Sequence, residues 1–129
     1  VNELLKYCKE NDIITAVATA TPTENAKKHL EKIGIADMFF KIVGGDSIEN
    51  GKPAPDIYLK AARELCLETE SCIALEDSPN GIIAAFSAGC KPIMIPDLTE
   101  PTEELKPLLY DCLPTLFNVI DILKREKGE

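Results

Sequence analysis

The sequence predicts an α/β fold in which a parallel β-sheet is covered by helices on both faces. Along the chain, patterns with a helical period alternate with short apolar runs, and this alternation is typical of βαβ units. The apolar runs give a second observation: residues 13–18 and 93–95 are almost continuously apolar, as expected for strands buried on both faces. We therefore expect a three-layer α/β/α architecture.

Each element follows from its own pattern. At 21–24, a capping-box spacing and a proline predict the start of the second helix, and Gly34 is placed to end it. Pro55 and Pro79 are placed to open the third and fourth helices. Residues 99–104 predict a loop that leads into a short helix. In chain order we expect a helix over 4–9, a strand over 13–19, a helix over 24–33, a strand over 42–43, a helix over 57–65, a strand over 72–75, a helix over 82–87, a strand over 92–95 and a final helix over 117–123.

Composition limits the classes of partner. The 129 residues suffice for one domain with a core, and the formal net charge of −8 disfavours nucleic acid or an anionic membrane as the main partner. No apolar run approaches the roughly 18 residues that span a bilayer, so we expect a cytoplasmic protein. The five cysteines are odd in number and form no Cys-x-x-Cys pair, which favours buried thiols in a reducing compartment over disulfides.

Polar residues gather where the predicted strands end. Thr19, Asp46 and the pair Glu76 and Asp77 lie at or just past such ends, and ligands of doubly wound sheets bind outside the carboxyl ends of the strands. The Thr19 hydroxyl and the following amides, which lead into a helix, suit phosphate oxygens. The alternative is structural, because threonine is common at strand ends and helix caps.

A lysine and two acids are candidates for charge chemistry. Lys52 lies in a proline-stiffened loop that would hold its ammonium beside a carboxylate and a phosphoryl group; the alternative is an ordinary solvated lysine. Glu76 and Asp77 follow a buried strand, where two adjacent acids repel each other unless a cation offsets them. Mg²⁺ is the expected cation, with Asp77 as direct ligand and Glu76 acting through water; solvated loop acids are the alternative.

Three segments together resemble motifs of one family. They are Val-Ala-Thr-Ala-Thr at 17–21, Gly-Lys-Pro-Ala-Pro-Asp at 51–56 and Leu-Glu-Asp-Ser-Pro-Asn-Gly at 75–81. In this order they resemble three of the four signature motifs of the haloacid dehalogenase-like (HAD-like) hydrolases, in the branch of β-phosphoglucomutase and sugar-phosphate phosphatases. The resemblance covers nearly the whole chain and implies a Rossmann-like core.

The resemblance also implies residue roles. Mg²⁺-assisted phosphoryl transfer would pass through an aspartyl-phosphate, with a small phosphorylated metabolite, such as a sugar phosphate, as substrate. Thr19 and Lys52 would be catalytic and would also bind the phosphate. Ala20 and Thr21 would add phosphate contacts. Asp77, aided by Glu76, would complete the metal site.

The first family motif, an Asp-x-Asp that supplies the nucleophile, is absent from the sequence. The resemblance therefore implies that residues 1–129 form a single, partial core domain, inactive alone and lacking the first strand and the cap. The missing amino-terminal segment of the same protein would be its partner. The absent strand would leave open edges on the two strands that end at Thr19 and Glu76. We therefore predict direct pairing of these strands across the gap, a rearranged sheet or an edge-mediated dimer. Pro22 stands where mutases tend to carry a lysine, which favours a phosphatase over a mutase.

Two function classes remain open at this point. One is the phosphatase or phosphomutase just described, and the other is a noncatalytic phosphate-binding or interaction domain that lacks the nucleophile. His29 has no serine or cysteine partner at a convincing position, so we interpret it as a surface residue. Asp46 and Asn25 are weaker site candidates.

Overall fold

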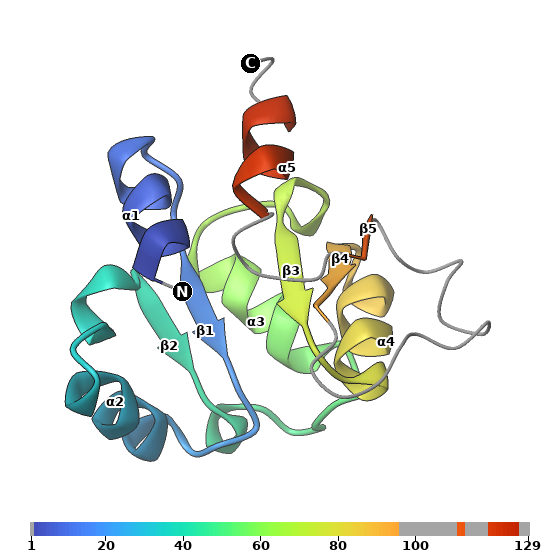
Figure 1. Cartoon of the computed structure of the whole chain (residues 1–129). Helices are drawn as coiled ribbons and strands as arrows, with labels where there is room; N and C mark the ends of the chain where they lie inside the picture. Colours follow the sequence, from blue (N-terminus) through green and yellow to red (C-terminus); the bar gives the residue numbers. More distant parts are fainter. Residues whose placement is uncertain (1, 96–110, 113–118, 127–129) are drawn as a thin grey trace.

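The computed structural model describes residues 2–95, 111–112 and 119–126, and Figure 1 shows their arrangement. Every helix and strand predicted within these ranges is present, with ends shifted by a few residues. The predicted strand over 13–19 is the most shortened, and the segment 99–104 lies outside the described residues. The elements are α1 (Asn2–Glu10), β1 (Ala16–Ala18), α2 (Thr23–Lys32), η1 (Ala36–Met38), β2 (Lys41–Val43), η2 (Gly45–Ser47), α3 (Asp56–Glu64), η3 (Thr69–Ser71), β3 (Ile73–Glu76), α4 (Pro79–Ala88), β4 (Lys91–Met94), β5 (Asp111–Cys112) and α5 (Val119–Glu126).

The strands form two parallel sheets. Strand β1 pairs with β2, with Val17 opposite Ile42, and β3 pairs with β4, with Leu75 opposite Ile93; β5 adds to the far side of β4. The arrows of β1, β2 and β3 point the same way in Figure 1. Within the described strands, β1 and β3 do not pair. The prediction that they pair directly across the position of the absent strand is therefore wrong. Two separate sheets replace the continuous one, and the edge-mediated dimer stays a prediction.

One apolar core joins the two sheets on the face covered by α3 and α4. Helix α3 contacts both strands of the first sheet and also helix α4, which covers β3 and β4. The buried cluster draws on β2, α3, β3 and α4 and on Cys90 just before β4, and Ala18 of β1 packs against it; its buried members are Val43, Ile57, Tyr58, Ala61, Ala74, Ala84, Ala85, Ala88 and Cys90. This cluster therefore crosses from one sheet to the other.

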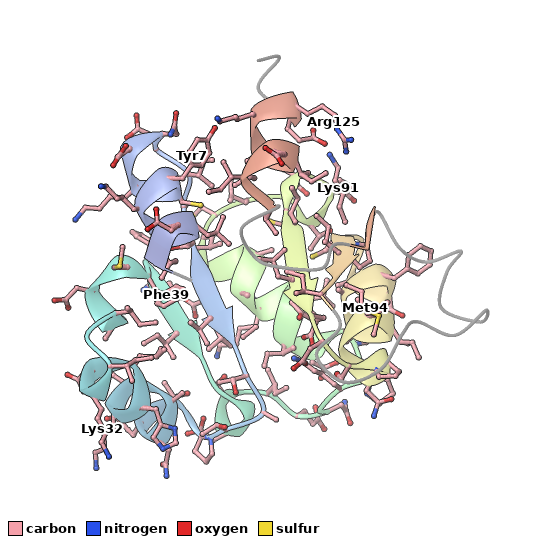
Figure 2. The ribbon with its side chains drawn as sticks, in the orientation of Figure 1. Tyr7, Lys32, Phe39, Lys91, Met94 and Arg125 are labelled. Atoms are coloured by element: carbon pink, nitrogen blue, oxygen red, sulfur yellow. The ribbon has the colours of Figure 1, made fainter. Side chains whose placement is uncertain are left out.

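Helices α1 and α5 cover the opposite face. Leu4 and Cys8 of α1 meet Val119 of α5 in a second buried cluster, against which Leu75 of β3 packs. Lys124 of α5 places its Nζ 6.0 Å from the ring centroid of Tyr7, which Figure 2 shows on the side of α1 that faces α5. The expected helix layers on both faces are therefore present.

A cavity of about 520 Å³ separates β1 from β3. Its walls come from the two strands and from the helices on either face, among them Ala16, Ala18, Ala61, Ala62, Ala74, Leu75, Leu4 and Val119. All three residues of β1 are only half-buried, whereas Ile93 and Met94 of β4 are fully buried. The apolar run of β1 was expected to be buried on both faces, but it borders this cavity, which we call the slot.

The N-terminus of helix α2 is capped by a side chain from another element, η2. The expected capping box is wrong, since Pro22 occupies the cap position and no side chain of this segment makes a cap hydrogen bond. Instead, the backbone N–H and the hydroxyl of Thr23 both donate to Asp46 Oδ1, at 2.8 Å each. Gly34 follows the helix with φ +80°, as its expected role at the end of α2 requires. Asp46 therefore joins α2 to η2 and has a structural role.

The cysteines agree with the expectation in part. Cys8 and Cys90 are buried and free, Cys72 is half-buried and Cys66 is exposed. Burial raises the pKa of the Cys90 thiol to about 11, so it stays protonated and unreactive. Among the described residues no helix is long and apolar enough to cross a membrane.

We predict that Asp46→Ala lowers the Tm at pH 7, because the first turn of α2 loses its only carboxylate acceptor from η2. The hydrogen bonds from Thr23 lower the pKa of Asp46 below its ordinary 3.8. A carboxylate with a lowered folded-state pKa stabilises the fold above its unfolded pKa and stops doing so as pH falls through its folded pKa. The Tm difference, followed by circular dichroism, should therefore shrink as the pH falls below 3.8 and through the lowered pKa of Asp46. Glu49→Ala, an exposed acid nearby, is the control and should leave the Tm unchanged; a deficit independent of pH would contradict this account.

Candidate active site

The candidate site lies where β3 ends and α4 begins. Ser78 is the N-cap of α4, its Oγ accepts a hydrogen bond from the Gly81 N–H at 3.1 Å, and Pro79 is the first helical residue. This turn is tight, because a Cβ added at Gly81 would overlap the Glu76 carboxylate. The sequence thus places Glu76 against the first turn of α4.

Lys52 and Glu76 form a largely buried ion pair. Lys52 Nζ donates to Glu76 Oε2, and the side chains are 18% and 7% exposed. The hydroxyl of Tyr58, in α3, donates to the same carboxylate oxygen. Lys52 Nζ also lies 5.4 Å from the centroid of the Tyr58 ring. The loop at 51–56 therefore does hold its ammonium beside a carboxylate, and the solvated alternative for Lys52 does not hold.

Tyr58 is the residue that the sequence analysis missed. Burial, followed by the nearby negative charge of Glu76, raises the pKa of the Tyr58 phenol far above its ordinary range. The phenol is therefore neutral across the physiological range and remains a hydrogen-bond donor. Its signal in the sequence is weak: a tyrosine on the apolar face of a helix normally indicates packing, and only its position six residues after Lys52 points to the site.

Asp77 differs from its neighbour. It is exposed, and within the described residues no hydrogen bond or ion pair holds its carboxylate. The described residues contain no group of three or more His, Cys, Asp or Glu side chains that could hold a metal ion. Mg²⁺ is commonly held by one or two carboxylates together with waters and substrate phosphate, so the donor set at this strand end fits Mg²⁺ as one part of such a site.

Thr19 lies one residue beyond the end of β1, whose arrow points the same way as that of β3 in Figure 1. Its N–H donates to the Val43 carbonyl at 3.0 Å, which extends the ladder with β2. Its Oγ1 accepts a hydrogen bond from the Thr21 N–H at 3.2 Å. The Thr21 amide is therefore engaged with Thr19, whereas the Thr19 hydroxyl keeps its hydrogen for donation.

The remaining candidates fall outside this group. His29 and Asn25 are exposed on α2, in line with the surface interpretation of His29. The structure thus brings Lys52 and Glu76 into contact, adds Tyr58, and leaves Asp77 exposed as the residue after Glu76. Asp46 is bound to the start of α2.

The chain is similar to known proteins over most of its length. The model of the haloacid dehalogenase-like hydrolase family matches residues 1–95. A phosphorylated carbohydrates phosphatase of Thermotoga maritima is 39% identical over 93 residues, covering 72% of this chain and 43% of the relative. A bifunctional riboflavin kinase/FMN phosphatase of Arabidopsis thaliana is 32% identical over 127 residues, covering 98% of this chain and 32% of the relative.

Among solved structures, CbbY from Rhodobacter sphaeroides in complex with phosphate superposes with a TM-score of 0.79 and 35% identity. The match covers 88% of this chain and 52% of the CbbY chain. The chain thus spans from about a third to about half of the length of these relatives. The residues that match the family model include all three motif segments. The chain belongs to the haloacid dehalogenase-like hydrolase family.

Proposed function

We propose that this chain supplies most of the active site of a Mg²⁺-dependent phosphatase acting on a small phosphorylated metabolite of the sugar-phosphate class. The observation that carries the proposal is the Lys52 ammonium, fixed by Glu76 at the end of β3, where the next residue, Asp77, is exposed. The relatives support the substrate class, since one is a phosphatase of phosphorylated carbohydrates and another has been crystallised with phosphate.

The residues would divide the work as follows. Lys52 offsets negative charge on the phosphoryl oxygens, and the Thr19 hydroxyl and the Ala20 N–H donate to them. The Thr21 N–H could donate to the phosphate only if it gave up its hydrogen bond to Thr19 Oγ1. Of the proposed phosphate-binding groups, it therefore has the least support. Asp77 would hold Mg²⁺, which neutralises phosphoryl charge when bound, with Glu76 supporting the site. The net reaction is hydrolysis of a phosphate monoester to an alcohol and inorganic phosphate. Pro22 favours this reaction over phosphoryl transfer within a sugar phosphate.

The nucleophilic carboxylate would come from a further segment of the same protein. The backbone groups of Thr15 and Thr19 face β2, so those of Ala16 and Ala18 face the slot; the same alternation turns Ile73 of β3 toward it. The apolar cavity between these two open edges fits an extended apolar strand, parallel to both neighbours. The end of such a strand would lie at the edge where Lys52 and Asp77 are.

The second candidate is a noncatalytic phosphate-binding domain. It is favoured by one observation, the absence of an Asp-x-Asp motif from the sequence. Under this alternative, the amino-terminal segment would fill the slot without bringing a reactive carboxylate, and phosphate would bind without turnover.

The first prediction of the proposal is activity on reconstitution. We expect Mg²⁺-dependent hydrolysis of p-nitrophenyl phosphate by the chain mixed with its amino-terminal segment, and none by the chain alone. Asp77→Asn should lower kcat/KM by about a hundredfold or more, because the carboxylate that would hold Mg²⁺ at the phosphoryl group is lost. Asp37→Asn, at an exposed acid of η1, is the matched control and should retain full activity.

Hydrolysis by the chain alone would show that the nucleophile lies within it and would contradict this division of roles. No turnover by a folded, associated mixture, together with phosphate binding measured by calorimetry, would favour the noncatalytic domain. A panel of sugar phosphates, assayed by release of inorganic phosphate, then tests the substrate class.

A second prediction concerns the slot itself. The amino-terminal segment should raise the Tm of the chain by about 10 °C when present at about a hundred times its Kd. Ala62→Leu, which fills part of the cavity, should abolish this rise, whereas Ala36→Leu in η1 should not. Light scattering should show any dimer of the chain alone dissociating as the segment binds. A Tm that does not respond to the segment would exclude the slot as its binding site.

A further inference from the structure

We propose that Tyr58 is a positioning residue that, by sharing Glu76 Oε2 with Lys52, keeps Glu76 as the anchor of Lys52 and leaves Asp77 as the cation-facing carboxylate. The inference rests on the proposed function and deepens it, because it assigns different tasks to the two adjacent acids at the end of β3. It also gives a task to a side chain that the phosphatase reaction itself does not require.

The hydrogen bonds of Glu76 carry the first step. Lys52 Nζ and the Tyr58 hydroxyl both donate to Oε2, and a carboxylate oxygen offers about two lone-pair positions. The other oxygen, Oε1, lies against the Cα of Gly81 at the start of α4. With the side chain 7% exposed, Glu76 is enclosed by the protein on all of these sides. A cation could therefore reach Glu76 through Oε2 only by displacing Lys52 or Tyr58.

The rigidity of Tyr58 carries the second step. Tyr58 is 8% exposed and packs in the buried cluster with Val43 of β2 and Ala74 of β3, which restricts the movement of its hydroxyl. Lys52, by contrast, sits in a loop on a long and flexible side chain. The fixed hydroxyl holds the carboxylate, and the carboxylate in turn holds the ammonium. Asp77 has no such contact in the described structure and remains available.

The chemical consequence is that the two acids at the end of β3 serve different cations: Glu76 pairs with Lys52, and Asp77 is left for the metal ion. If Glu76 turned toward a bound cation, Lys52 would lose its ion pair and its place beside the phosphoryl group. The Tyr58 hydroxyl opposes that rotation without adding charge to the site. Removing it should therefore affect the placement of Lys52 more than the affinity for the cation.

The first experiment measures Lys52 directly in the chain alone. Acetylation by an amine-reactive ester, followed by mass spectrometry, gives the rate at each lysine. We expect the Lys52 rate to rise about fivefold in Tyr58→Phe, as loss of one hydrogen bond implies, and further in Glu76→Gln. The rate at exposed Lys28 serves as the internal reference. Tyr7→Phe, at a tyrosine outside the site, is the matched control and should leave the Lys52 rate unchanged.

The second experiment separates the two acids in the reconstituted protein. Calorimetric titration with Mg²⁺ in the presence of inorganic phosphate should give affinities within about twofold of the wild type for Tyr58→Phe, whereas Asp77→Asn should weaken Mg²⁺ binding by more than about tenfold. In turnover of p-nitrophenyl phosphate, Tyr58→Phe should lower kcat without moving the Mg²⁺ concentration that gives half-maximal rate. Gly81→Ala, which pushes the Glu76 carboxylate away, should reproduce this pattern, with Gly51→Ala as its unstrained control.

The outcomes are distinguishable. An unchanged Lys52 acetylation rate in Tyr58→Phe overturns the inference whatever the activity. A loss of Mg²⁺ affinity in Tyr58→Phe as large as in Asp77→Asn also overturns it, because Glu76 would then be a direct ligand set by Tyr58. If the acetylation rates change as expected but the wild-type protein hydrolyses nothing, the anchoring of Lys52 is supported and the proposed phosphatase fails.

Discussion

Helix α3 packs against both sheets, and the other parts of the structure depend on this contact. The two sheets share no hydrogen-bonded strands within the described residues, so the buried cluster of α3 and α4 is what holds β2 and β3 at fixed positions. The same helix begins just after the Lys52 loop and carries Tyr58 inward. A single apolar face therefore sets both the separation of the sheets and the geometry at the end of β3.

Charge burial at the strand end follows from this placement. A carboxylate that is 7% exposed is costly unless donors satisfy it, and Glu76 receives one charged and one neutral donor from different elements. Asp77, one residue further, is exposed and needs no such compensation. Two adjacent acids thus differ because one lies against α4 and the other faces outward. The order of residues in the turn, rather than their chemistry, decides which acid is enclosed.

The sequence predicted the element order and the layers, because these depend on hydrophobic period and on local signals such as Pro79 and Gly34. It predicted a carboxylate beside Lys52 but did not identify that carboxylate as Glu76, since 24 residues separate the two and no local rule links them. The cap of α2 could not be predicted from local sequence either, because Asp46 and Thr23 are separated by a similar number of residues in the sequence. Tyr58 was missed because its ring is a core residue and only its hydroxyl belongs to the site.

The alternation of backbone direction along β1 has a consequence for amide hydrogen exchange. The Thr19 N–H is bound to the Val43 carbonyl and, by the same alternation, that of Val17 faces β2, whereas those of Ala16 and Ala18 face the slot. Exchange with solvent deuterium would then be slow and fast at successive residues of one short strand. A strand occupying the slot would remove this alternation, so the exchange pattern of three alanine and valine amides reports whether the sheet is continuous.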